Sequence, residues 1–334
     1  MNDNFYCSLG DYGVVHVSGS DAAAFLQDHF CNDVDLLAEH AIQLSGYCTP
    51  KGRLLAILTV MRLQQDYYLI MHRSVVASVV KRLSMFAMMP RPAGKESGGR
   101  MVRTDVVLTD ASDAWTIIGL SGTAIPNDIR AADQVAGTHE HTHWFQHDAA
   151  GDRVMSLVAA DRVDQYLAVL REAGVDEAAA SVWELADIRA GLPQITAATQ
   201  ESVVPQMANM HSLNAVSFKK GCYPGQEIVA RMQYLGTLKR IMQRFRVSGA
   251  DANPGDTLVD TEQKEVGLIL RVATGDTSDD QEMLAVVRTS ALETLTTPMT
   301  AADSTDSPLR LAGEDTSKIQ WLALPYRVQT EGSQ

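Results

Sequence analysis

The sequence lacks the features that carry a protein into or across a membrane. Among its 334 residues, no apolar run approaches the roughly 20 residues that a membrane-spanning helix requires. The opening stretch, Met1 to Cys7, has neither the basic nor the apolar segment of a secretory signal. We therefore expect a cytoplasmic protein that has no membrane partner.

The sequence has few cysteines, and no two of them lie close together. The four cysteines are Cys7, Cys31, Cys48 and Cys222, and no two of them have the Cys-x-x-Cys spacing. In a reducing compartment, scattered cysteines are most simply free thiols. An iron–sulfur cluster ligated by this chain alone is poorly supported, because such clusters use several thiolates at close spacing.

Basic residues are also in deficit. The chain has 28 Lys and Arg against 41 Asp and Glu, which gives a formal net charge of −13. An acidic surface repels a phosphate backbone, whereas most nucleic-acid-binding proteins show a basic stripe. We expect no direct nucleic-acid partner, so any effect on RNA is predicted to be indirect.

The remaining composition is that of an ordinary globular protein, with 46% hydrophobic and 21% charged residues. Two or three domains fit a chain of this length. Short β-branched runs predict strands, and apolar residues at helical spacing predict helices, so the expected fold class is α+β. The predicted strands are 14–17, 42–48, 54–62 and 67–71, and the predicted helices are 74–88, 161–173 and 177–190.

After about residue 240 the pattern changes to short strand-like runs separated by turn residues. These runs are 245–247, 266–272, 284–288 and 322–328. Regularly spaced short strands with intervening turns are typical of a small β-barrel.

The segment from Lys219 to Glu227, with the sequence KKGCYPGQE, has the highest density of unusual residue types. Its two glycines and its proline force a tight backbone around Cys222. A helix is predicted from Gly225 to Tyr234, so the thiol precedes a positive helix end and follows Lys220. Both neighbours stabilise a thiolate and lower the pKa of cysteine. The alternative is a glycine-rich turn around a buried, inert cysteine.

Three polar side chains of the same segment and its helix are further candidates. Gln226, Glu227 and Arg231 present an amide, a carboxylate and a guanidinium, and we expect them to surround one pocket or to hold the loop.

The segment Lys-Gly-Cys-Tyr-x-Gly-Gln-Glu resembles the signature of the YgfZ family. These folate-binding proteins belong to the glycine-cleavage T-protein superfamily and are associated with iron–sulfur cluster maintenance and tRNA methylthiolation. The resemblance covers most of residues 10–240. It includes Val17 to Gln27, which resembles the opening of the superfamily, and Trp183 to Pro193, which resembles its central helix.

The resemblance implies a T-protein-like region of two intertwined α+β subdomains over residues 1–240 and a β-barrel domain over 241–334. It also implies tetrahydrofolate or another reduced folate as the cofactor. Positions matching Tyr12 and Trp183 are associated with folate binding in this family, where an aromatic face stacks on the flat rings of the ligand.

The chain departs from its superfamily at two places. Ala56 and Ile57 stand where aminomethyltransferases carry an acidic pair, and neither residue can accept a proton, which argues against glycine cleavage. Arg189 stands where many relatives have a glutamate that could bind the pterin. Arginine has only donors, so it is expected to contact the glutamate tail of a folate or to pair with Asp187.

Two basic or imidazole-rich stretches have alternative interpretations. His139, His141, His143 and His147 suggest metal ligands, but same-face strand positions about 7 Å apart do not converge on one ion. A solvated strand or hairpin is therefore preferred. Lys51 and Arg53 form a small basic turn that is either a solvated hairpin or a contact for folate carboxylates.

Three functional hypotheses follow. The first is a folate-dependent accessory protein that supports iron–sulfur proteins or their assembly factors and, indirectly, tRNA modification, with Cys222 as a reactive thiol. The second is a one-carbon transferase of the aminomethyl type. The third is a non-enzymatic folate-sensing module in which the loop around Cys222 (the Cys222 loop) docks a partner. The residues alone leave open whether the protein catalyses turnover.

Overall fold

The computed structural model describes residues 4–92, 101–130, 135–139, 142–148, 151–236, 238–277, 279–296, 308–314 and 316–329. The chain forms two compact units, and each unit combines distant parts of the sequence. The first contains 1–47, 58–180 and 219–223, and the second contains 48–57, 181–218 and 224–334. Among the described residues, no helix is both long and apolar enough to cross a membrane.

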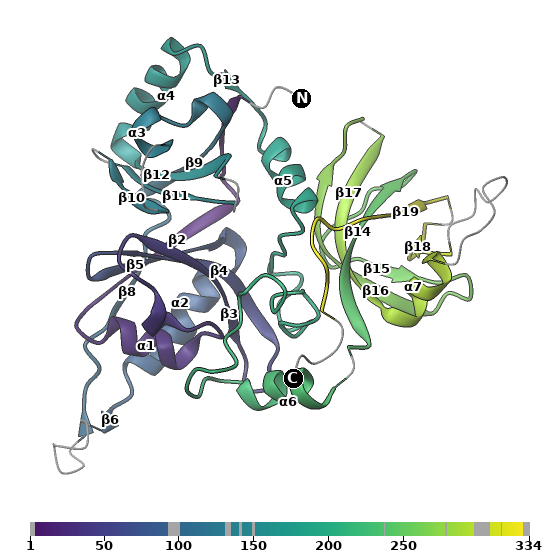
Figure 1. The fold of residues 1–334 in the computed structure, drawn as a ribbon, viewed down its shortest axis with the longest axis horizontal. Helices are drawn as coiled ribbons and strands as arrows, with labels where there is room; N and C mark the ends of the chain where they lie inside the picture. Colours follow the sequence, from purple (N-terminus) through teal and green to yellow (C-terminus); the bar gives the residue numbers. More distant parts are fainter. Residues whose placement is uncertain are drawn as a thin grey trace. The chain divides into compact units, whose positions relative to one another are not determined.

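The first unit is built around two large sheets (Figure 1). One has the strand order β10 (Ala136–His139), β11 (Thr142–Gln146), β12 (Arg153–Ala159), β9 (Trp115–Ser121), β1 (Phe5–Ser8) and β13 (Asp176–Glu177). The other has the order β3 (Ala41–Cys48), β4 (Leu54–Leu63), β5 (Asp66–His72), β2 (Tyr12–Ser18) and β8 (Val107–Asp110). The far end of the β3–β4 hairpin, Cys48–Ile57, belongs to the second unit.

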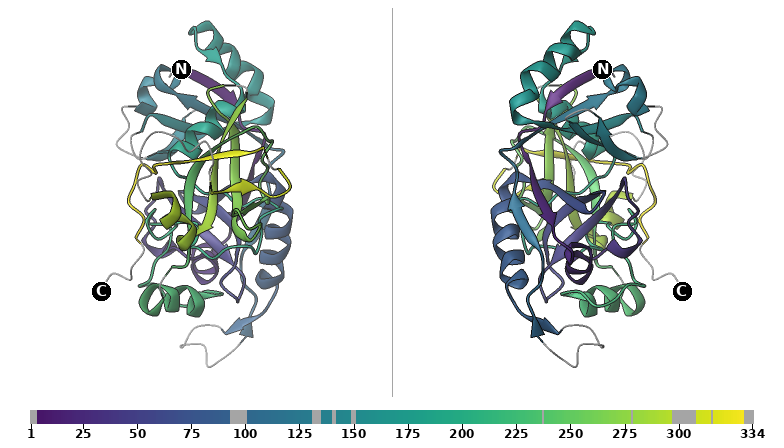
Figure 2. Two further views of the ribbon diagram at one scale, coloured as in Figure 1. Left: turned by 90° about the vertical axis from the view of Figure 1, so that its right-hand side faces the viewer. Right: turned by 90° about the vertical axis from the view of Figure 1, so that its left-hand side faces the viewer.

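Helices cover these sheets through apolar faces. In α2 (Arg73–Ala87) the buried residues Val75, Val79 and Leu83 recur at helical spacing. This helix contacts β2, β5 and β8, and Figure 2 shows it as the blue helix beside that sheet. The remaining elements of the unit are α1 (Ala22–His29), α3 (Asn127–Arg130), α4 (Val163–Glu172), the 3-10 helices η1 (Val34–Leu36), η3 (Gly122–Ala124) and η4 (Ala160–Arg162), and the strand pair β6 (Arg91–Pro92) and β7 (Met101–Val102).

The second unit contains a curled, half-barrel sheet (Figure 1). Its strand order is β18 (Arg310–Leu311), β15 (Thr257–Val259), β16 (Glu265–Thr274), β17 (Asp280–Arg288), β14 (Arg240–Ser248) and β19 (Lys318–Leu322). In β14, Phe245 and Val247 alternate with polar residues and point into the apolar core of this sheet. The helices of the unit are α5 (Ala180–Arg189), α6 (Gln226–Leu235) and α7 (Thr289–Thr296).

Most predicted elements are present, and two differ. The helix predicted from Glu177 begins at Ala180, because Asp176 and Glu177 pair with β1. The strand predicted over 322–328 is wrong, because β19 ends at Leu322. Pro325 has no backbone N–H to donate to a sheet, and the Tyr326 hydroxyl instead donates to the carbonyl of Gly191 at 2.7 Å.

Candidate functional site

The thiol of Cys222 is exposed, while the side chains of its neighbours Lys220 and Tyr223 are buried. Lys220 is only 8% exposed and Tyr223 only 6%, and the Lys220 ammonium lies 5.3 Å from the centre of the Tyr223 ring. Two buried side chains therefore hold the backbone on either side of Cys222, and its sulfur lies between them in solvent. Cys7, Cys31 and Cys48 are buried, and none of the four cysteines forms a disulfide, which confirms the prediction of thiols.

Lys220 is anchored by backbone carbonyl groups at the end of α1. Its ammonium donates to the carbonyls of Gln27, Phe30 and Asn32 at 2.5, 2.6 and 3.0 Å. Burial lowers the pKa of Lys220 to about 8, and electrostatic interactions with Cys31 and nearby aspartates oppose this fall. These contacts give Lys220 an anchoring role. Its predicted effect on the Cys222 thiol stays a prediction.

Gly225 makes the turn between this loop and α6 possible. It caps the helix with φ +86°, a conformation that favours glycine. A Cβ at this position would lie 2.6 Å from the Gly52 Cα and 2.6 Å from the Thr49 carbonyl oxygen. Gly225 therefore packs directly against the β3–β4 turn, about 170 residues earlier in the chain.

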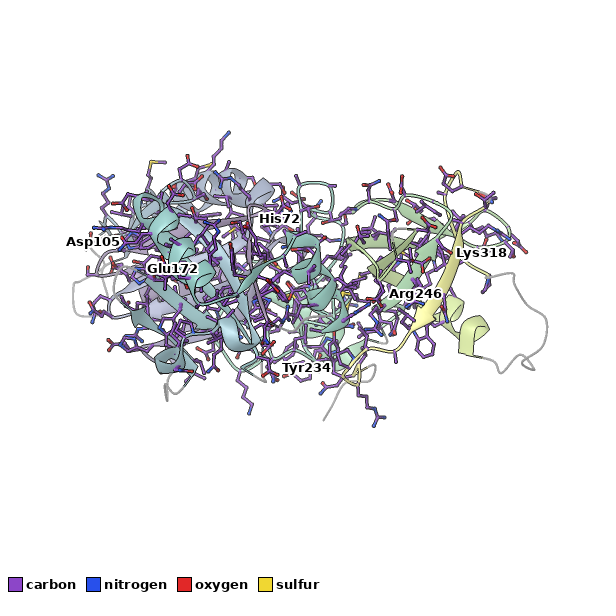
Figure 3. The ribbon with its side chains drawn as sticks, turned by 90° about the horizontal axis from the view of Figure 1, so that it is seen from above. His72, Asp105, Glu172, Tyr234, Arg246 and Lys318 are labelled. Carbon is purple, nitrogen blue, oxygen red and sulfur yellow. The ribbon has the colours of Figure 1, made fainter. Side chains whose placement is uncertain are left out.

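The three polar candidates lie at the start of α6, and the predicted helix is confirmed within one residue at each end. Gln226 is half-buried, whereas Glu227 and Arg231 are exposed. Glu227 is in the first turn, where a carboxylate is favoured by the helix dipole. Tyr234, exposed near the other end of the helix, is labelled in Figure 3. The contact of Gln226, Glu227 and Arg231 with a folate stays a prediction.

Trp183 and Arg189 both lie on α5 in the second unit. Trp183 is 0% exposed, so protein atoms cover its whole ring, and a stacking role would require this cover to move. Arg189 binds Glu282 and Asp276, each at 2.7 Å. The expected alternative pair of Arg189 with Asp187 is wrong.

Asp187 has a different arginine partner. Its buried carboxylate accepts from Arg271 at 2.7 Å, and the same guanidinium also binds Glu184 at 2.7 Å. Arg271 comes from β16 of the half-barrel sheet, so α5 is fixed to that sheet by buried charged groups. Sequence reasoning missed this network because its members are about 85 residues apart.

The residues of the hairpin turn, and those that stand in place of the acidic pair, make contacts that support the fold. Ala56 and Ile57 are buried in β4, where both side chains are apolar. Arg53 donates to the carbonyl of Ser202 at 2.6 Å, which ties the turn to the segment that follows α5. Lys51 is exposed. The proposed contact of this basic turn with folate carboxylates stays a prediction.

The histidine stretch forms the predicted hairpin, from β10 and β11, but His143 is half-buried rather than fully solvated. The ring of His143 is 4.8 Å from Tyr68 and 4.7 Å from Trp115, measured between ring centres. Burial, with a smaller contribution from His16, lowers the pKa of His143 to about 4. His141 lies outside the described residues. Within the described part of the chain, no three His, Cys, Asp or Glu side chains are grouped as a metal site.

Tyr12 lines an open pocket of about 320 Å³ in the first unit. It is paired across the β2–β5 register with His72, which is labelled in Figure 3. The pocket residues come from the β1–β2 turn, the start of α2 and the β8–β9 turn: Ser8, Leu9, Gly10, Tyr12, Arg73, Ser112, Asp113, Trp115, Thr116 and Ile117. Sequence reasoning identified only Tyr12 among them, although an isolated Trp after the polar turn Ser112-Asp113 was a usable signal.

Comparison with known proteins assigns relatives to most of the chain. Residues 7–160 match the family model described as the GCVT N-terminal domain. The tRNA-modifying protein YgfZ of Enterobacter sp. (strain 638) is 31% identical over 245 residues, which are 70% of this chain and 69% of that protein. The YgfZ protein of Aliivibrio fischeri (strain ATCC 700601 / ES114) is 29% identical over 75% of this chain and 74% of that protein.

A solved structure has the same fold. It is the glycine cleavage system aminomethyltransferase T from Bartonella henselae, with a TM-score of 0.67 and 13% sequence identity. The match covers 99% of this chain and 88% of that one. The predicted T-protein-like α+β fold is therefore confirmed, with the C-terminal strands forming a curled half-barrel.

Proposed function

Because the chain belongs to the YgfZ family, we propose that it binds a reduced folate and supports tRNA modification, acting through iron–sulfur proteins and the thiol of Cys222. The single observation that carries this proposal is the exposed Cys222 thiol between two buried anchors, Lys220 and Tyr223. A nucleophilic or redox-active cysteine must be accessible, and fixed neighbours reduce the conformational freedom that its reaction must overcome.

Glycine cleavage is a weaker candidate. The structure buries Ala56 and Ile57 in β4, and neither side chain supplies a carboxylate for proton transfer. An acid–base group is a major contributor to such one-carbon chemistry. Robust transfer of an aminomethyl group or formaldehyde to tetrahydrofolate by the purified protein would overturn this assignment.

The ligand part of the proposal is tested by calorimetric titration of the purified protein with tetrahydrofolate. We expect saturable binding with one site. Heat changes no larger than those of dilution, at ligand concentrations up to the millimolar range, would reject folate binding.

The thiol part is tested in a bacterium from which its own family member has been deleted. We expect the wild-type chain to restore methylthiolated nucleosides in tRNA, measured by mass spectrometry, and Cys222→Ser to fail. Gly221→Ala is the matched neighbour control, because Gly221 is exposed and its added methyl group meets no atom within 4 Å. Full restoration of these nucleosides by Cys222→Ser would refute the proposed role of the thiol.

A further inference from the structure

Three methionine side chains are exposed at the C-terminal end of α2. Met85, Met88 and Met89 are 52%, 63% and 53% exposed, while the opposite face of the helix is buried through Val79 and Leu83. The N–H groups of Met88 and Met89 still bond back into the helix, and residues three or four positions apart share one helix face. Contiguous exposed apolar side chains mark interaction sites, and flexible thioethers adapt to the shape of a partner.

The same helix is basic in an acidic chain. α2 carries Arg73, Lys81 and Arg82 and no acidic residue, whereas the whole protein has a net charge of −13. Lys81 is exposed and lies one turn before Met85, so an ammonium group borders the methionines. Such a border attracts a negatively charged partner and repels a positively charged one. The occupant that fits is therefore a segment that is acidic and has an apolar face.

The C-terminal end of α1 contacts both this end of α2 and the Cys222 loop. The ring of His29, the last residue of α1, lies 5.0 Å from the ring of Phe86, measured between ring centres (Figure 1). The next residue, Phe30, accepts a hydrogen bond from the Lys220 ammonium at 2.6 Å. All of these residues belong to the first unit. A partner that binds the methionines therefore lies near the exposed thiol.

We define the methionine surface as Met85, Met88 and Met89 together with the bordering Lys81. We propose that the methionine surface binds an acidic segment with an apolar face on a protein partner, and that this contact brings the partner to the Cys222 thiol. This inference rests on the proposed function, in which the protein acts through iron–sulfur proteins and this thiol. Three apolar side chains make a small contact, typical of transient interfaces that bury less than about 1,200 Å².

The test uses a peptide probe that reports its arrival at the thiol. The probe is an amphipathic helix with leucine on one face and glutamate on the other. A Gly-Ser linker of about ten residues, with a mean span of about 17 Å, joins it to a cysteine that is activated as a disulfide with 2-nitro-5-thiobenzoate. The Cys222 thiolate attacks the cysteine sulfur of the peptide, a protein–peptide disulfide forms, and the yellow thiobenzoate leaves. A second probe has lysine in place of glutamate.

The rates of the two probes measure docking. We expect the glutamate probe to react about 10-fold faster than the lysine probe or more, because docking raises the effective concentration of the disulfide. The triple variant combines Met85→Gln, Met88→Gln and Met89→Gln, which keeps side-chain length and helix propensity. It should lose the advantage of the glutamate probe but react at the wild-type rate with the small reagent 5,5′-dithiobis(2-nitrobenzoate). Lys81→Glu should reduce the preference for glutamate, and Cys222→Ser gives the background rate.

A matched control is available on α4. Val169 is also an exposed apolar residue on a helix of the first unit, with 60% of its surface exposed. Val169→Gln should leave both probe rates unchanged. Circular dichroism and thermal unfolding of every variant report whether it is folded. Equal rates of the two probes with the wild type, or a glutamate preference that survives in the folded triple variant, would overturn the docking role of the methionine surface.

A cellular test separates this inference from the proposed function. In the bacterium that lacks its own family member, we expect the triple variant to restore fewer methylthiolated nucleosides than the wild type. If both restore them equally, the methionine surface is overturned and the proposed function stands. If the wild type restores none, the proposed function fails, and the probe rates still decide the docking surface.

Other occupants give different results with the same triple variant. Flotation of the wild type with phosphatidylglycerol vesicles, or its retention by bulk tRNA, would make a membrane or an RNA the occupant if the triple variant loses it. Self-association in sedimentation that the triple variant loses would make the occupant a second copy of this chain. Each of these results would overturn the assignment to an acidic protein partner, and we expect none of them.

Discussion

Replacing Lys220 by Met removes the ammonium that holds the Cys222 loop while keeping a side chain of similar length. Three carbonyl groups, at 2.5, 2.6 and 3.0 Å, then lose their donor. Hydrogen bonds to a charged group contribute about 1.5–3 kcal/mol each. The change also removes the burial cost of the charge. A fall in pKa from 10.5 to about 8 corresponds to about 3 kcal/mol.

The difference between these effects predicts that Lys220→Met lowers the free energy of unfolding by about 1.5–6 kcal/mol. Urea unfolding followed by circular dichroism measures it. Lys219→Met is the matched control, because the adjacent lysine carries the same charge but is exposed. A loss below about 0.5 kcal/mol, no larger than that of ordinary surface substitutions, would refute the anchoring role of Lys220.

The same variant separates anchoring of the loop from activation of the thiol. If Lys220 only anchors the loop, its loss leaves the already exposed Cys222 thiol reacting with iodoacetamide at pH 7 at an unchanged rate. If Lys220 instead lowers the pKa of the thiol, its loss reduces the thiolate fraction and slows the reaction. We expect the unchanged rate, measured by mass spectrometry of the labelled peptide, and a slower rate would contradict it.

Three further predictions concern single side chains. Gly225→Ala should destabilise the protein by more than 2 kcal/mol in thermal unfolding, because its Cβ would meet the backbone at 2.6 Å, whereas Gly221→Ala should be nearly neutral. Trp183→Ala should cost about 3–5 kcal/mol because the ring is fully buried; full stability combined with lost folate affinity would instead assign Trp183 to the ligand. His143 has a folded pKa of about 4, below its unfolded value. The unfolded chain therefore binds more protons between pH 6.5 and 4, and stability should fall by about 1 kcal/mol from pH 7 to pH 5. His143→Phe should flatten this dependence in urea midpoints, and an unchanged slope would exclude His143 as its source.

Local sequence signals predicted those parts of the site that depend on neighbouring residues. Gly225 and Pro224 indicated a tight turn before a helix, and α6 begins at Gln226. The periodicity of α2 and the β-branched run of β2 are equally local, so both elements were predicted near their observed bounds. Backbone propensity and short-range hydrogen bonds decide such features, and one sequence contains both.

The partners of the same residues were not predictable in this way. Nothing near Gly225 indicates that Gly52 lies against it, and nothing near Arg189 indicates Glu282, which is 93 residues later. A tryptophan in the sequence also does not reveal whether its ring is buried, as in Trp183, or lines a pocket, as in Trp115. Burial and pairing depend on the folded chain as a whole, so an aromatic or charged residue in one sequence has several possible roles.

The division of the chain between its units has a consequence for the order of synthesis. Lys219–Tyr223 belongs to the first unit, although the rest of that unit ends at Ala180. The carbonyls at the end of α1 therefore cannot bind the Lys220 ammonium until about 190 further residues have been translated. At about 5–20 residues per second this delay lasts on the order of ten seconds or more. During that interval most strands of the two sheets are themselves translated, so the segment that carries Cys222 is the last part of the first unit to be added.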